Sequence, residues 1–168
     1  MRRLLVGSLL LLVSGAPGCA STPFDGKTYS NDELAFQVGA YPSTWRAIQA
    51  EGTLLAFRDD THQATVALNG RCGKDGDDVP LTTLTAHLFL QFTDQDPSEQ
   101  REVSLDGRSA LRSSLTATLD GVPKRFVVYV LKKDECVYDF VWIQNQSAPQ
   151  DSREFDAFVR DFRALSRP

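Results

Sequence analysis

Two apolar runs flank a charged turn in residues 121–144, which read GVPKRFVVYVLKKDECVYDFVWIQ. Successive side chains of a strand point to opposite faces of a sheet, so each run can be divided into two sets of alternate residues. Both sets are mostly apolar: Phe126, Val128 and Val130 against Val127, Tyr129 and Leu131, then Cys136, Tyr138, Phe140 and Trp142 against Val137, Asp139, Val141 and Ile143. The pattern predicts a β-hairpin in the middle of an antiparallel sheet that is covered on both faces.

Shorter alternating segments predict the other strands of this sheet. They lie at residues 34–38, 45–48, 54–57, 64–68, 103–105 and 108–119, and we expect polar loops at 70–80 and 93–99. Asp106-Gly107 and Asp120-Gly121 bound the strand at 108–119. Asp-Gly is a favoured central pair of two-residue hairpin turns, because both positions need a positive φ. We therefore expect this strand to pair with both of its neighbours in the sequence.

Two segments carry apolar residues at helical spacing. Residues 80–92 begin with Pro80, which suits the first turn of a helix, and place Leu81, Leu84, Leu88 and Phe92 on one face. Residues 152–165 predict a second helix, with an apolar stripe formed by Phe155, Phe158, Val159, Phe162 and Leu165. The prediction is an α+β fold with an antiparallel sheet of about seven strands and helices packed on it.

The N-terminus has the pattern of an export signal. Arg2 and Arg3 precede an apolar run from Leu4 to Val13, and the small residues that follow lead to Cys19. The segment Ala16-Pro17-Gly18-Cys19 resembles the signal of bacterial lipoproteins, in which the cysteine is lipidated and becomes the mature N-terminus. The resemblance implies a signal peptide at 1–18 and an anchor at Cys19, and the composition of the following residues indicates a flexible tether over 19–31. The alternative is ordinary cleavage after Gly18 or Ala20, which would release a secreted protein without lipid.

The folded part, residues 32–168, resembles a known fold family. Its segments Phe36-Gln37-Val38, Pro42-Ser43-Thr44-Trp45 and Gly52–Phe57, followed by an amphipathic helix, are similar to those of PsbP-type proteins. The family includes photosystem proteins and bacterial envelope lipoproteins, and most of its members dock to other proteins. The resemblance implies a PsbP-like α/β/α sandwich over about residues 30–166 that acts as a binding module rather than as an enzyme.

The net charge of the chain limits the classes of partner that we expect. The full chain has a formal charge of −4, and without residues 1–18 it keeps 16 basic and 22 acidic residues, a charge of −6. A mildly acidic surface argues against nucleic acid as a partner. The remaining expected contacts are the membrane, through the lipid on Cys19, and an envelope protein.

Cys72 and Cys136 are the two cysteines of the folded part. One pair of cysteines in an exported domain is typical of a disulfide, and Cys72 follows one predicted strand while Cys136 begins another. The alternative is two buried free thiols. We expect the disulfide.

The loop at 70–78, GRCGKDGDD, combines glycines, a lysine and three aspartates. No Ser or Thr follows Lys74, so the loop does not fit a phosphate-binding loop. Asp75, Asp77 and Asp78 lack the closing glutamate of a calcium loop. We expect a solvated loop without a metal or a cofactor.

No arrangement of residues predicts catalysis. His62 and His87 lack a nucleophile partner in any motif, so we expect each to be exposed or a satisfied polar residue. Asp139 lies within an apolar strand, and a buried carboxylate needs a partner, such as Lys124 or Arg125 across the hairpin. The alternative is a position near the edge of the sheet, where the carboxylate would reach solvent.

The sequence therefore favours a lipid-anchored envelope protein, at the periplasmic face of the outer membrane because Ala20 and Ser21 are not acidic, that docks to or scaffolds another envelope protein. The alternative is a periplasmic carrier that holds a small apolar ligand against Tyr138, Phe140 and Trp142.

Overall fold

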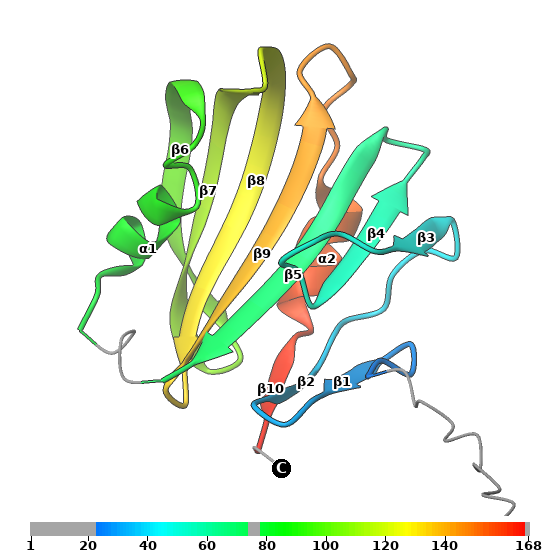
Figure 1. Cartoon of the computed structure of the whole chain (residues 1–168), viewed down its shortest axis with the longest axis vertical. Helices are drawn as coiled ribbons and strands as arrows, with labels where there is room; N and C mark the ends of the chain where they lie inside the picture. Colours follow the sequence, from blue (N-terminus) through cyan, green and yellow to red (C-terminus); the bar gives the residue numbers. More distant parts are fainter. Residues whose placement is uncertain (1–22, 74–77, 167–168) are drawn as a thin grey trace, which may run out of the picture.

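The computed structural model describes residues 23–73 and 78–166 and places seven strands in one antiparallel sheet (Figure 1). These strands are β3 (Trp45–Ile48), β4 (Leu55–Asp59), β5 (Ala64–Cys72), β6 (Thr93–Leu105), β7 (Arg108–Leu119), β8 (Val122–Lys133) and β9 (Cys136–Asn145). Their order across the sheet is β3-β4-β5-β9-β8-β7-β6. Helix α1 (Leu81–His87) and helix α2 (Arg153–Arg160) pack on it, so the expected α+β fold is confirmed.

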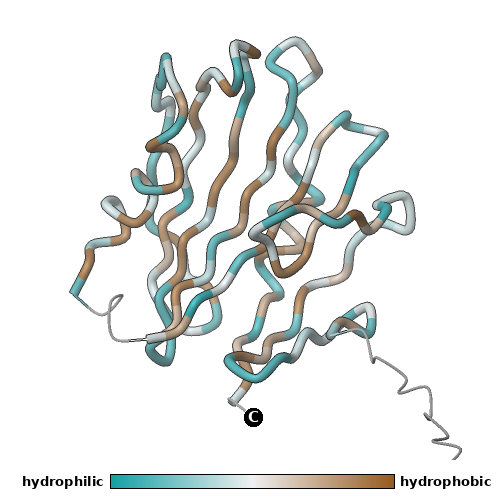
Figure 2. Tube along the Cα trace, viewed as in Figure 1, coloured by the Kyte–Doolittle hydropathy of each residue, from teal (hydrophilic) through white to brown (hydrophobic). Residues whose placement is uncertain are grey.

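The predicted hairpin is the centre of the sheet. β9 is the middle strand, and it pairs with β8 on one side and with β5 on the other. Val127 and Val128, which point to opposite faces, both have no exposed surface. The apolar residues therefore follow the central strands in Figure 2, whereas the turns at the ends of the sheet are polar.

Each face of the sheet has its own core. On one face Phe155 and Phe158 of α2 pack against the aromatic side chains of β9, among them Phe140 and Trp142. On the other face Leu84 of α1 and the following Phe89 pack against alternate residues of β7, β8 and β9. The sheet thus lies between two helices, as Figure 1 shows with α1 in front and α2 behind.

A second, three-stranded sheet lies below α2 in Figure 1. It has the order β1-β2-β10, formed by β1 (Thr28–Ser30), β2 (Ala35–Gln37) and β10 (Arg163–Leu165). The prediction of a tether up to residue 31 is therefore wrong at its end, because residues 28–30 form a strand. The helix predicted to run to residue 165 ends at Arg160, and Phe162 reaches the core from the turn before β10.

β6 replaces a predicted polar loop. We expected a loop at 93–99 and a strand only at 103–105, but β6 runs from Thr93 and pairs with β7 throughout. It is an edge strand with almost every side chain exposed, so its sequence lacks the alternation of a half-buried strand. Its register shifts on both sides of Pro97, where a proline is tolerated because this strand has a free edge.

Both predicted Asp-Gly turns are confirmed. Asp106 and Gly107 have φ of 48° and 74°, and Asp120 and Gly121 have φ of 49° and 76°. These turns join β6 to β7 and β7 to β8. In the described ranges, no helix has the length and apolar character needed to cross a membrane.

Candidate functional site

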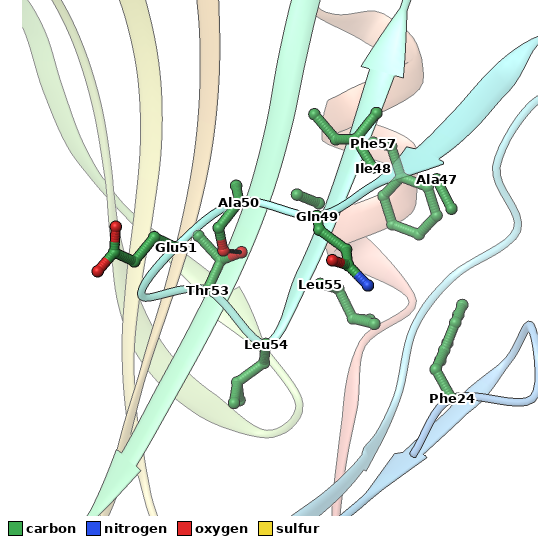
Figure 3. A pocket seen from close by; sticks show the side chains of 11 residues that line it. Phe24, Ala47, Ile48, Gln49, Ala50, Glu51, Thr53, Leu54, Leu55 and Phe57 are labelled. Atoms are coloured by element: carbon green, nitrogen blue, oxygen red, sulfur yellow. Dashed lines mark hydrogen bonds between the residues drawn. The ribbon is translucent and has the colours of Figure 1, made fainter. Parts of the chain in front are cut away.

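An apolar groove lies beside the edge strand β3. It has a volume of about 720 Å³ and is lined by residues of β3, of β4, of the turn between them and by Phe24. Figure 3 shows Phe24 on one side of this space and Leu55 and Gln49 on the other, with Glu51 pointing away. The groove is therefore built from the first described residues and from the β3–β4 hairpin.

Small and larger apolar side chains together line the groove. Ala47, Ala50 and Ala56 line it together with the larger Ile48, Leu54 and Leu55. Its wall is firm, since Phe57 is buried and packs edge-to-face on Phe24 with their ring centroids 6.2 Å apart. β3 is an edge strand of the large sheet, and two of its residues, Ala47 and Ile48, line the groove.

The turn at 50–53 holds the polar side of the groove in place. Thr53 donates hydrogen bonds to the Ala50 carbonyl oxygen from its backbone N–H, at 3.3 Å, and from Oγ1, at 2.8 Å. Gly52 adopts a φ of 72° in this turn, a conformation that glycine adopts without steric cost. Glu51 is the one charged side chain among the described residues that line the groove. The other lining residues are apolar except Gln49 and Thr53, so this surface is suited to binding an apolar segment.

The aromatic strand residues proposed to line a ligand pocket belong to the core instead. Tyr138, Phe140 and Trp142 are at most 2% exposed. Phe140 packs edge-to-face on Phe162 with the ring centroids 4.9 Å apart. None of the three lines the groove. The side chains predicted to hold a ligand are therefore packed against α2 and the turn that follows it.

Cys72 and Cys136 form a disulfide between neighbouring strands. They are directly opposite each other in the register of β5 and β9, with Cα atoms 4.0 Å apart. The bond ties the end of β5 to the start of β9. Cys19, the predicted site of lipidation, lies outside the described residues.

The glycine- and aspartate-rich loop follows this disulfide. Asp75 and Asp77 lie outside the described residues, and Asp78 is exposed. The loop leads into α1, whose first turn contains no acidic residue.

Asp139 is buried, but its partner is not the one we predicted. Arg71 of β5 donates from Nη1 to Asp139 Oδ2 at 2.5 Å. Lys124 contacts Asn145, and Arg125 donates to the Ala148 carbonyl oxygen. The register explains the error, because Asn69 on the neighbouring strand β5 is opposite Asp139 and Arg71 lies two residues further along that strand. Burial raises the pKa of Asp139, and Arg71 offsets this only in part.

A second buried polar network was missed from the sequence. Tyr129 donates from its hydroxyl to Asp156 Oδ1 at 2.6 Å, and Arg112 Nε donates to both groups at 3.1 Å. Arg112 and Tyr129 are buried on neighbouring strands, directly opposite each other, and Asp156 is on α2. Burial, strengthened by the hydrogen bond to Asp156, raises the pKa of Tyr129 to about 12. The network fixes α2 on the sheet. Alternation on β7 could not have identified it, because it groups Arg112 with the polar residues Ser114 and Thr116.

The two histidines have different surroundings. His87 is exposed in the last turn of α1. His62 lies in the turn between β4 and β5, where its Nδ1 is 2.7 Å from Oδ2 of the buried Asp59. His62 thus has a carboxylate partner three residues away that we did not single out in the sequence.

Comparisons with known proteins find similarity of structure only. No protein-family model matches the sequence, and no curated protein sequence matches it. Cyanobacterial PsbP (CyanoP) from Synechocystis sp. PCC 6803 is similar, with a TM-score of 0.57 and 13% identity over 90% of this chain and 99% of that one. LpqN of Mycobacterium tuberculosis, described as involved in cell envelope biogenesis, has a TM-score of 0.52 and 11% identity over 79% of this chain and 86% of that one.

A protein of Bacteroides thetaiotaomicron VPI-5482 has a TM-score of 0.58 and 12% identity over 85% of this chain. The chain spans about half the length of that protein, 50%. At such low identity these likenesses show the fold alone, which is PsbP-like.

Proposed function

We propose that this protein is a lipid-anchored protein of the cell envelope whose PsbP-like domain binds an extended, apolar segment of another envelope protein. The observation that carries the proposal is the groove beside β3. An edge strand offers unpaired backbone groups to an added strand, while neighbouring pockets accept its side chains. The proposal is supported by the position of β3 at the edge of the sheet and by the apolar groove against its residues Ala47 and Ile48.

The lining of the groove defines the chemistry of the partner segment. Ile48, Leu54 and Leu55 would contact apolar side chains, and Glu51 is the charged residue at the margin. The expected segment is therefore apolar, with a Lys or Arg at the end that meets Glu51. A net charge of −4 on the whole chain favours the same basic flank.

The anchor is proposed to be the lipid on Cys19, on the periplasmic side of the outer membrane. Intact mass of the protein from the membrane fraction tests it directly, and a chain that begins at Cys19 with added acyl mass is the expected result. A soluble chain that begins beyond Cys19 would contradict the anchor and leave the docking proposal intact.

The docking proposal is tested by photocrosslinking in the producing cell. A photoreactive amino acid at position 49 should yield one defined crosslinked partner, whose crosslinked peptide is apolar with a basic flank. Ile48→Asp should abolish the product and Glu51→Lys should weaken it. Val122→Asp, which changes an exposed apolar residue at the start of β8, is the matched control and should leave it unchanged.

The outcome also separates docking from the carrier hypothesis. The groove volume of about 720 Å³ falls within the usual range of small-molecule pockets. If native mass spectrometry finds a small apolar molecule that Ile48→Asp releases, and no crosslinked protein forms, the domain is a carrier and the docking proposal is wrong.

A further inference from the structure

Four ionisable side chains from two distant segments meet at one end of the sheet, away from the groove. Asp59 and His62 lie at the turn between β4 and β5, and Asp151 and Glu154 lie at the start of α2. His62, Asp151 and Glu154 line a hollow of about 410 Å³ together with Arg153 and Ala157, and the buried Asp59 lies against His62. The site is therefore accessible, and its two halves are held by different elements.

Three of these side chains place one ligand atom each around a common point. His62 Nδ1 is 2.7 Å from Asp59 Oδ2 and 3.8 Å from Glu154 Oε2. All three atoms lie within 4.8 Å of one another. Around a tetrahedral Zn²⁺ with bonds of about 2.0–2.2 Å, neighbouring ligand atoms are about 3.4 Å apart. Small movements of the His62 ring and of Glu154 would therefore place ligand atoms at three of the four positions of such a site.

The ligands differ in mobility in a way that suits binding. The Asp59 side chain is 2% exposed, and its Oδ1 accepts a hydrogen bond from the His62 backbone N–H at 3.1 Å, which fixes the carboxylate. Gln144, which is buried on β9, donates to the His62 carbonyl oxygen at 2.6 Å and holds the turn. Glu154 is 47% exposed and free to move toward a cation.

The other ring nitrogen of His62 also faces a carboxylate. His62 Nε2 is 3.9 Å from Asp151 Oδ2. A histidine that binds a metal through one nitrogen usually donates its other N–H to a carboxylate, which orients the ring. Arg153 donates to both oxygens of Asp151, from Nε to Oδ1 at 2.9 Å and from Nη2 to Oδ2 at 2.6 Å, which holds this carboxylate in place. A proton on Nε2 of His62 would thus face Asp151 Oδ2, which would leave Nδ1 to bind a cation.

Charge and ligand type define the cation. Three carboxylates face His62, and Arg153 balances one of them, so the cluster carries an excess of negative charge. Calcium and magnesium prefer six or more oxygen ligands, whereas an imidazole with carboxylates suits first-row divalent metals. Water would fill the remaining positions.

We propose that Asp59, His62 and Glu154 bind a divalent cation of the zinc class, with Asp151 orienting the His62 ring. The site lies apart from the β3 groove, and the proposal does not depend on partner docking. The bound cation would join the β4–β5 turn to the first turn of α2.

Thermal unfolding and equilibrium dialysis of the untagged domain with Zn²⁺ test the proposal. We expect one Zn²⁺ per chain and a higher melting temperature in its presence. Glu154→Gln, which alters an exposed side chain, should weaken binding at least about 10-fold, and Asp151→Asn should weaken it by about 10-fold or more. His62→Ala should abolish binding, while His87→Ala, the exposed histidine of α1, should bind as the wild type does.

The tautomer of His62 gives a second readout that a structural ion pair would not change. In ¹⁵N spectra, Zn²⁺ should move the Nδ1 resonance of His62 and leave the proton on Nε2. The proposal is wrong if Zn²⁺ causes no stabilisation of the wild type. It is equally wrong if His62→Ala and the wild type respond alike, or if Ca²⁺ replaces Zn²⁺ at equal concentration, since a purely acidic surface would give those results.

Discussion

Asp139 is a carboxyl group on the central strand with almost no access to solvent. Its side chain is 2% exposed, Arg71 reaches only Oδ2, and Oδ1 has no hydrogen-bond partner among the described residues. Removing Arg71 would leave a buried charge without compensation. We expect Arg71→Ala to lower the free energy of unfolding by about 1–3 kcal/mol at pH 7, measured by urea titration.

The raised pKa of Asp139 gives a pH dependence of a definite sign. The native state holds this proton more tightly than the unfolded state, so the contribution to stability is fully present below the unfolded pKa of about 4. It is lost as the pH rises through the folded pKa. Asp139→Asn should therefore gain stability relative to the wild type between pH 4 and pH 7. A difference that does not change with pH, or an equal change in the exposed Asp32→Asn control, would contradict this.

Tyr129 gives the corresponding prediction at alkaline pH. Tyr129→Phe removes the hydrogen bonds to Asp156 and Arg112 and should cost about 1–2 kcal/mol at pH 7. Because burial raises the folded pKa to about 12, the native phenol stays protonated when the unfolded one, with a pKa of about 10, has ionised. The difference in the free energy of unfolding between the wild type and Tyr129→Phe should therefore decrease from pH 10 to pH 12. A difference between the wild type and Tyr129→Phe that stays constant over this pH range would contradict the prediction.

At the scale of elements, one glycine sets how closely the chain before β3 approaches α2. A Cβ at Gly39 would lie 2.5 Å from the Phe158 carbonyl oxygen, to which the Gly39 N–H donates at 3.2 Å. The backbone segments at Gly39 and Phe158 would have to move apart. We expect Gly39→Ala to lower stability by about 1–3 kcal/mol in thermal or urea unfolding. Ala40→Ser at the neighbouring exposed position should change it by less than about 0.5 kcal/mol.

The disulfide joins two strands whose cysteines are 64 residues apart in the sequence. Closing a loop of this length reduces the entropy of the unfolded chain, by up to roughly 4 kcal/mol in the chain-entropy model. Reductant should therefore lower the melting temperature of the wild type to that of Cys72→Ser/Cys136→Ser. If reductant lowers the melting temperature of the double variant by the same amount, the effect does not come from this disulfide.

The sequence predicted those elements whose side chains alternate or recur, and it missed those held by the backbone alone. β8 and β9 were predictable because both of their faces are buried, and the Asp-Gly turns because both positions need a positive φ. β6 was partly missed because its exposed side chains show no pattern, and β1 because a three-residue strand leaves almost none. The β3 groove could not be predicted, since it depends on Phe24 lying next to the β3–β4 hairpin.

At the scale of the whole molecule, Phe162 connects the two sheets. It has no exposed surface, and its ring packs on Phe36 of β2 and on Tyr138 and Phe140 of β9. Phe162→Ala should cost about 3–5 kcal/mol. Leu165→Ala, three residues later and 37% exposed, should cost much less. Equal losses in urea unfolding would show that the small sheet, and not this ring, determines stability.

The small sheet also sets the order in which the molecule can be completed. β2 pairs with β1, a few residues before it, and with β10, near the last described residue. A ribosome releases β1 and β2 early, but the second neighbour of β2 exists only once Arg163–Leu165 has been made. Ala164 of β10 is paired with Phe36 of β2. Contacts between residues so far apart in the sequence slow folding. Until Phe162 has been made, its aromatic ring is absent and part of the core is open, so the incomplete chain has a period in which a chaperone can bind it.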